Sequence, residues 1–158
     1  MTDPNTPYPR GFTTIELIVI IVVIGILSVV AIPRMNLIDG FDEIGYRDQV
    51  IASLEFARKS AVAQRRNVRI TVGSNSLSFH IASGAPEGGA ANTFDRQLLL
   101  PGSSSNQIVP RQAATTVTGP ATLIFDPLGR ATAASFVYTV TGDATRTVTV
   151  EAGTGYVR

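Results

Sequence analysis

One stretch of the sequence is apolar for long enough to match a lipid bilayer. From Leu17 to Ile32 every residue is apolar except Gly25 and Ser28. Wound as a single helix, residues 12–32 would be about 30 Å long, which is the thickness of a bilayer core. The stretch therefore predicts one membrane-spanning helix.

The flanks of this stretch differ from those of a secretory signal peptide. Such a signal has a shorter apolar core followed by a small-residue cleavage site, whereas here Ile32-Pro33-Arg34-Met35 follows. The small-residue junction lies on the other side, before Phe12. Cleavage there would leave the membrane-spanning segment attached to the mature chain.

A carboxylate, Glu16, stands at the front of the apolar stretch. A lone acidic side chain in the hydrocarbon region costs about 2.5 to 3.5 kcal/mol, so Glu16 requires a partner. In one interpretation it reaches the lipid headgroups at the membrane surface. In the other it pairs with a positive group of another chain, because no Lys or Arg lies within the stretch.

A specific motif overlaps the start of the stretch, where residues 11–17 read GFTTIEL. With the apolar run and Pro33 behind it, this motif resembles the amino terminus of type IV prepilins and pseudopilins. The resemblance implies that a prepilin peptidase cuts after Gly11 and methylates the new amino terminus on Phe12. It also implies that Glu16 meets the amino-terminal charge of a neighbouring subunit in a filament, and that Pro33 marks the first kink of the helix.

Length and composition agree with this class of protein. The chain has 158 residues, a formal net charge of +1 and no cysteine. The length allows one modest domain beyond the apolar stretch. The absence of cysteine excludes disulfides, zinc ribbons and thiol catalysis, and the near-neutral charge gives no global reason to expect nucleic acid as a partner.

The acids that follow the apolar stretch have two interpretations. Asp39 or Asp42 can cap a helix over residues 39–66, since acids are favoured in a first helical turn. A calcium loop is the alternative, but residues 39–43 lack the alternating ligands and the closing glutamate of that motif. We therefore expect a helix cap and no metal site.

The pattern from residue 39 to about Gln64 is that of an amphipathic helix. Two favourable pairs four residues apart, Glu43 with Arg47 and Glu55 with Lys59, support it. We expect its apolar face to pack on a sheet. Eight residues fall on that face at helical spacing: Phe41, Ile44, Val50, Ile51, Leu54, Ala57, Ala61 and Val62.

Residues 67–158 alternate in the manner of antiparallel strands. One hairpin is predicted from residues 68–72 and 77–81, and a second from residues 136–140 and 148–150. A further strand over residues 122–125 leads into a turn. The stretches Gly84 to Asn92 and Pro101 to Asn106, rich in Gly, Ala, Ser and Pro, are expected to be flexible surface loops.

Three of these stretches, residues 57–68, 124–130 and 148–158, resemble the minor pilins of the GspH/FimT class, which includes the H-type minor pseudopilin of type II secretion. The resemblance implies an α+β, pilin-like fold: a long amino-terminal helix, membrane-spanning in its first half, packed on a small antiparallel sheet. It also implies a structural subunit of a type II secretion pseudopilus or a type IV pilus that initiates or caps the filament.

The expected organisation has four parts. A leader peptide (1–11) precedes a membrane-spanning and filament-core helix (12–38), an amphipathic helix (39–66) and a β-rich head (67–158). The resemblance places the protein in the bacterial inner membrane with its head in the periplasm, and afterwards in a periplasmic pseudopilus or an extracellular pilus. Its partners would be the prepilin peptidase, other pilins or pseudopilins, and membrane lipid before assembly.

An enzyme is the first competing class. His80 is the only histidine and is expected to face outward from a strand, and no nucleophile elbow, phosphate loop or paired metal ligands accompany it. Asp126, before Pro127, is interpreted as a turn former rather than an acid or base. We therefore expect no catalytic residue, no cofactor and no metal.

A DNA-binding minor pilin for natural transformation is the second competitor. A patch of arginines could hold phosphates, and Arg65, Arg66 and Arg158 are its candidate contacts. Pilins of that kind carry a carboxy-terminal Gly-Arg-x-Arg motif, whereas this chain ends Gly-Tyr-Val-Arg. Arginines at a helix end and on solvated strands are the simpler explanation. The further arginines that could join the patch are Arg69, Arg130 and Arg146.

Overall fold

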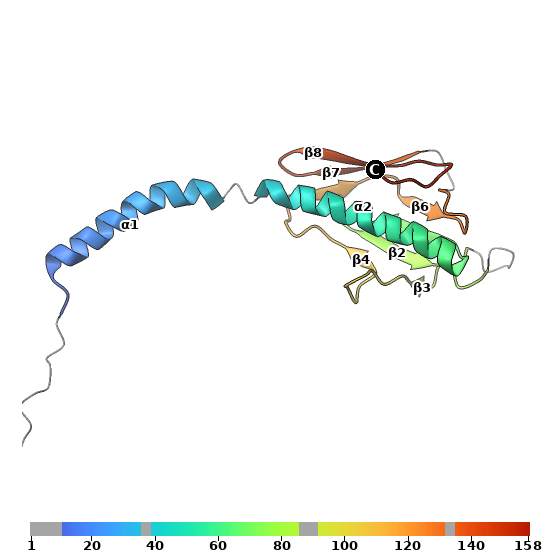
Figure 1. Ribbon diagram of the computed structural model, residues 1–158, viewed down its shortest axis with the longest axis horizontal. Coiled ribbons are helices and arrows are strands. Elements are labelled where there is room, and N and C mark those ends of the chain that lie inside the picture. Colours follow the sequence, from blue (N-terminus) through green and yellow to red (C-terminus); the bar gives the residue numbers. More distant parts are fainter. Residues whose placement is uncertain (1–10, 36–38, 86–91, 132–134) are drawn as a thin grey trace, which may run out of the picture. The chain divides into compact units, whose positions relative to one another are not determined.

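The computed structural model describes residues 11–35, 39–85, 92–131 and 135–158, and of residues 29–35 and 39–41 it describes the backbone alone. The chain forms two compact units, Met1–Ile38 and Asp39–Arg158 (Figure 1). The first unit contains helix α1. The second contains helix α2 and all of the strands.

Helix α1 runs from Thr14 to Met35. Its start is capped by Thr13, whose Oγ1 accepts a hydrogen bond from the Glu16 backbone N–H at 3.3 Å. Ser28 satisfies its hydroxyl within the helix by donating to the Ile24 carbonyl oxygen at 2.7 Å. Within the described part of the chain, no helix combines the length and the apolarity that crossing a membrane demands.

Large apolar side chains cover the first part of α1 on every side. From Ile15 to Leu27 each of them is at least 45% exposed. An all-round apolar helix is typical of one that is buried by lipid or by other helices. Within its own unit, α1 therefore presents a surface that needs an apolar environment.

Helix α2 spans Asp39–Gln64 and ends where the sequence pattern predicted. Its buried face is only partly the predicted one, because Ile44 is 37% exposed and Val62 is 47% exposed. Val62 directly follows Ala61 at the end of the buried row, and Ile44 directly follows the buried Glu43. The row also includes a tyrosine that the pattern missed. That row follows 3.6-residue spacing: Tyr46, Val50, Leu54, Ala57 and Ala61.

The strands form two antiparallel sheets rather than the single small sheet that was expected (Figure 1). The larger sheet has the order β3-β2-β1-β6, with β4 also paired to β2. The predicted first hairpin is confirmed, since Val68 pairs with Ile81 and Val72 with Leu77. The strands of this sheet are β1 (Val68–Val72), β2 (Leu77–Ile81), β3 (Arg96–Gln97), β4 (Gln107–Ile108) and β6 (Thr122–Phe125).

The smaller sheet contains β5 (Thr116–Thr118), β7 (Phe136–Thr141) and β8 (Thr145–Val150), in the order β5-β7-β8. The predicted second hairpin is confirmed by the pairing of Phe136 with Val150 and Thr141 with Thr145. Helix α2 contacts β1 and β6 of one sheet and β7 and β8 of the other. One continuous core therefore joins the helix to both sheets.

The predicted loop from Pro101 to Asn106 is wrong at its last residue. Asn106 is 8% exposed, and its side-chain amide donates to the Phe79 carbonyl oxygen at 3.1 Å. The adjoining backbone also bonds to β2, because the Phe79 N–H donates to the Asn106 carbonyl oxygen. The end of this stretch is thus fixed to the sheet. Of the other predicted loop, residues 86–91 lie outside the described residues.

Glu43 makes a connection that local spacing did not predict. The residue is only 2% exposed. Its carboxylate accepts the Ala144 N–H at 2.7 Å and lies 3.3 Å from Nε of Arg146. The predicted pair with Arg47 is therefore wrong, whereas Lys59 does pair with Glu55 at 3.3 Å. Glu43 ties the first turns of α2 to the β7–β8 hairpin.

Replacing Glu43 with Ala should lower the free energy of unfolding by about 2 to 3 kcal/mol, because it leaves the Ala144 N–H and the Arg146 guanidinium without their partner. The matched control, Glu55→Ala, removes an exposed pair and should cost at most about 0.5 kcal/mol. Urea denaturation of a fragment starting at Asp39, followed by circular dichroism, measures both. Equal losses for the two variants would contradict the role given to Glu43.

Candidate assembly site

Three of the four predicted processing and assembly residues lie together at the start of α1. Gly11, Phe12 and Glu16, with Thr13, line a hollow of about 320 Å³. Phe12 is 79% exposed, so both the Gly11–Phe12 bond and the first helical turn are open to another molecule. Pro33 lies within the bounds of α1, near its end.

The role of Thr13 was missed by the sequence analysis. Residues 13–16 read Thr-Thr-Ile-Glu, which is the capping-box pattern of a Ser or Thr followed by a Glu three residues later. The hydrogen bond from the Glu16 N–H to Thr13 is one half of that box. The pattern was available in the sequence, and through it Thr13 fixes the backbone of Glu16 in the first turn of α1.

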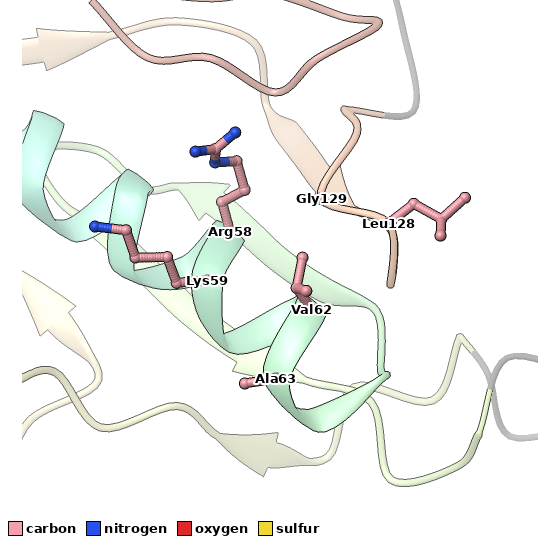
Figure 2. Close-up of a pocket in the computed structure, with 6 residues that line it drawn as sticks. All are labelled: Arg58, Lys59, Val62, Ala63, Leu128 and Gly129. Carbon is pink, nitrogen blue, oxygen red and sulfur yellow. The ribbon is translucent and has the colours of Figure 1, made fainter.

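A second hollow lies where the end of α2 meets the turn after β6. It has a volume of about 320 Å³ and is lined by Arg58, Lys59, Val62, Ala63, Leu128 and Gly129. Figure 2 shows Val62 directed toward the turn at Gly129, while Leu128 extends from that turn into the open. An adjoining hollow of about 640 Å³ shares Val62 and Leu128 and includes Arg65 and Arg66. We refer to the two together as the α2-end groove.

The turn that forms one wall of the groove is built by Asp126, as the sequence analysis expected of this residue. Its Oδ1 accepts the Leu128 and Arg130 N–H groups at 2.9 and 2.8 Å, and its Oδ2 accepts Nε of Arg130 at 2.8 Å. Burial works to raise the pKa of Asp126, but these hydrogen bonds from Arg130 and Leu128 outweigh it and lower the pKa below its ordinary value. Asp126 is thus a structural carboxylate.

Two glycines bring the carboxy-terminal tail against this turn. Gly129 and Gly155 have φ angles of 79° and 63°, which are strained for any residue with a Cβ atom. A Cβ on Gly155 would collide with the Gly129 carbonyl oxygen, and one on Gly129 would lie 3.0 Å from Val62. Arg58 adds a hydrogen bond to the Thr154 carbonyl oxygen at 3.1 Å. Helix, turn and tail are therefore in direct contact here.

Arg65 ends helix α2 in an unusual backbone conformation. Its φ is 50°, its N–H bonds the Val62 carbonyl oxygen, and the Arg66 N–H bonds that of Ala61. This is the double hydrogen bond of a Schellman cap, in which glycine is the usual residue at the position of Arg65. The exposed Arg65 side chain consequently stands at a backbone position that disfavours side chains.

The arginines predicted to share a nucleic-acid surface have different surroundings. Arg66 donates to the Ala82 carbonyl oxygen at 3.2 Å and also to that of Ser83. Arg158 lies 3.7 Å from Glu151. Arg65 and Arg66 therefore adjoin the α2-end groove, whereas Arg158 is held in an ion pair on the tail.

The remaining candidate arginines also have partners within the chain. Arg69 stacks over the Phe94 ring at 4.5 Å, Arg130 pairs with Asp126 at 2.8 Å, and Arg146 pairs with Glu43. A local pattern of positive charges was visible in the sequence, but the acids and rings that engage them come from distant segments. A phosphate-binding surface built from these arginines stays a prediction.

His80 lies on the face of β2 opposite the core and is half-buried. Its Nε2 is 3.4 Å from the Asn106 amide, and burial, with the charge of Arg69 second, lowers its pKa below the ordinary value. A neutral imidazole is thus favoured in the folded chain. Among the described residues, no three acidic or histidine side chains are placed to hold a metal ion.

The head formed by α2 and the two sheets matches a known family. The family model described as Type II transport protein GspH matches residues 47–154, which is more than half of the chain. The chain belongs to the GspH family. This confirms the resemblance to the GspH/FimT class that the sequence indicated. Comparison with curated protein sequences gives no match.

Two solved structures resemble the head. The type IV minor pilin FimU of Pseudomonas aeruginosa is 18% identical over 72% of this chain and 84% of its own, with a TM-score of 0.51. The minor pseudopilin EpsH of the Vibrio cholerae type 2 secretion system is 15% identical over 73% of this chain and 92% of its own, with a TM-score of 0.53. At these identities the likeness establishes an α+β fold with antiparallel sheets that is shared with minor pilins.

Replacing Gly155 with Ala should destabilise the head by about 1 to 3 kcal/mol, because the new Cβ is strained at positive φ and meets the Gly129 carbonyl oxygen. Gly153→Ala is the matched control in the same tail, since a Cβ there meets nothing within 4 Å. Thermal unfolding of the two variants compares them. A melting temperature equal to wild type for Gly155→Ala would contradict the close contact of tail and turn.

Proposed function

We propose that this chain is a minor pilin or pseudopilin, a non-enzymatic structural subunit that initiates or caps a type II secretion pseudopilus or a type IV pilus. The observation that carries the proposal is the joining, in one chain, of the GFTTIEL motif and apolar helix α1 to a head of the GspH family. The likeness of the head to FimU, a type IV minor pilin, and to EpsH, a minor pseudopilin, supports it.

In this proposal residues 1–11 are a leader that the prepilin peptidase removes, leaving Phe12 as the methylated amino terminus. Residues 12–38 span the inner membrane until the subunit enters the filament, and the head is periplasmic. The all-round exposure of apolar side chains in α1 supports this, because both lipid and a bundle of helices would cover them. The internal hydrogen bond of Ser28 also supports it, since it hides a hydroxyl from an apolar medium.

Glu16 is proposed to neutralise the amino terminus of a neighbouring subunit, and Pro33 to mark the first kink of the helix. The exposure of Glu16 beside Phe12 supports the first role, because both partners of such a contact would be accessible at the same helix end. Two competing roles for Glu16 remain to be separated by experiment: contact with lipid headgroups and completion of the Thr13 capping box.

The DNA-uptake alternative has weaker support from the head. Of its three candidate contacts, Arg158 is held in an ion pair with Glu151, whereas Arg65 and Arg66 line the α2-end groove. Phosphate binding by all three would have to break the ion pair of Arg158. We therefore place the chain with the secretion and pilus subunits that do not depend on a nucleic-acid surface.

Gly11→Val should leave the leader attached, because the peptidase has to approach the backbone closely at the residue before the cut. Mass spectrometry of membrane-extracted protein, produced together with a prepilin peptidase, measures the amino terminus. The expected wild-type product begins at Phe12. Intact residues 1–11 on the wild-type chain would overturn the proposed function.

Glu16→Gln separates the three roles of Glu16, because glutamine keeps the capping box but has no charge. We expect normal leader cleavage and membrane level but loss of the protein from sheared filaments or co-purified tip complexes. Loss of a buried partner charge amounts to about 3 to 5 kcal/mol. Thr13→Ala, which removes the cap alone, should assemble as wild type. Undiminished filament recovery for Glu16→Gln would rule out the pairing role.

A further inference from the structure

The α2-end groove combines exposed apolar surface with an excess of positive charge. We propose that it is a docking site for an acidic peptide segment that carries a bulky apolar side chain, presented by another subunit of the filament. The source of the segment rests on the proposed function, whereas the chemistry of the groove rests on the described residues alone.

The apolar part of the groove comes from both of its walls. Val62 on α2 is 47% exposed, and Leu128 on the turn is 72% exposed. These two side chains line both hollows, and Ala63 and Pro127 extend the apolar lining on either side. A volume of about 320 Å³ beside Leu128 has room for one large side chain of a partner.

The charge of the groove has one sign. Arg58, Arg65 and Arg66 line it, and no acidic residue is among the described residues that do. Arg58 and Arg66 donate to backbone carbonyl oxygens, which orient the guanidinium groups without neutralising them. Carboxylates on a partner would therefore meet oriented, uncompensated charge, and such complementarity favours one kind of partner over others.

The backbone at Arg65 supports a binding role for its side chain. Glycine would fit the left-handed cap without strain, whereas the Cβ of arginine is disfavoured there. A strained residue that is kept in place is a reason to look for a function of its side chain. The Arg65 side chain is exposed and lines the groove. It can therefore contribute a positive charge that binds a carboxylate of the partner.

The chain itself carries a segment of the required chemistry. Residues 37–42 read LIDGFD, in which Phe41 has one aspartate before it, Asp39, and one after it, Asp42. Asp39 is the first residue of α2, whose 26 residues make a helix about 39 Å long. A subunit with this layout offers the segment at one end and the groove at the other. A contact between unlike surfaces of this kind is head-to-tail, and it joins a capping subunit to one neighbour along the filament.

The test is a titration of the full chain in detergent with a labelled peptide of residues 37–42, blocked at both ends, followed by fluorescence anisotropy. An amide version with Asn at both aspartates is the comparison ligand. We expect the acidic peptide to bind at least about tenfold more tightly than the amide version at low salt, with the difference shrinking as salt rises.

Variants of the groove have matched controls elsewhere on the surface. Leu128→Ser should weaken peptide binding about tenfold, whereas Leu99→Ser, at a residue that is 52% exposed, should not change it. Arg65→Gly should weaken binding while the melting temperature stays equal or rises, because it relieves the strained cap. Arg96→Gln removes a charge from β3 and should have no effect.

Equal binding of the two peptides, or unchanged binding by Leu128→Ser, would overturn the proposal. Tighter binding of duplex DNA than of the acidic peptide would overturn it in favour of a phosphate site. The titration needs no filament, so its failure is distinct from a failure of the proposed function, which is judged by leader cleavage and filament recovery.

Discussion

The structure of the head depends on one row of side chains on α2 that is buried against both sheets. Tyr46, Val50, Leu54, Ala57 and Ala61 are all at most 4% exposed. The two sheets are not joined strand to strand by any pairing among the described residues, so their connection rests on the packing of both against α2 and on Asn75 of the β1–β2 turn, whose side chain accepts the Val117 N–H of β5 at 3.2 Å. Bulky residues occupy the first half of the row, and alanines occupy the second half. The Gly129 turn and the tail approach α2 at the end where the buried side chains of the row are alanines.

The parts of the fold that were predicted correctly are those that neighbours in sequence decide. The hairpins of β1 with β2 and of β7 with β8 follow from short turns and period-two alternation, and the end of α2 follows from its periodicity. Glu43 shows the limit of such rules. A residue four positions away was the obvious partner, but burial of the carboxylate favoured Arg146, which is 103 positions away. Distances of this kind carry no signal in a single sequence.

The same distinction applies to the candidate site. The GFTTIEL motif is a contiguous stretch, so it could be recognised from the residues alone, and only the Thr13 cap within it was overlooked. The α2-end groove consists of a helix end and a turn more than sixty positions later, and neither part is distinctive in sequence. The arginines show the converse case: their charges were visible in the sequence, whereas the partners that engage them, such as Phe94 for Arg69, depend on the fold.

The carboxy-terminal tail has a consequence for how this head can meet its neighbours. Arg158 exchanges two backbone hydrogen bonds with Thr149, and the Glu151 N–H bonds the Tyr156 carbonyl oxygen. Beside them, the Arg47 side chain donates to the Thr147 carbonyl oxygen at 3.2 Å. The outer edge of β8 is thereby occupied, and an open strand edge is the usual template for unwanted main-chain pairing between copies. Main-chain pairing between two copies at this edge would first have to displace the tail, so contacts made there depend on side chains.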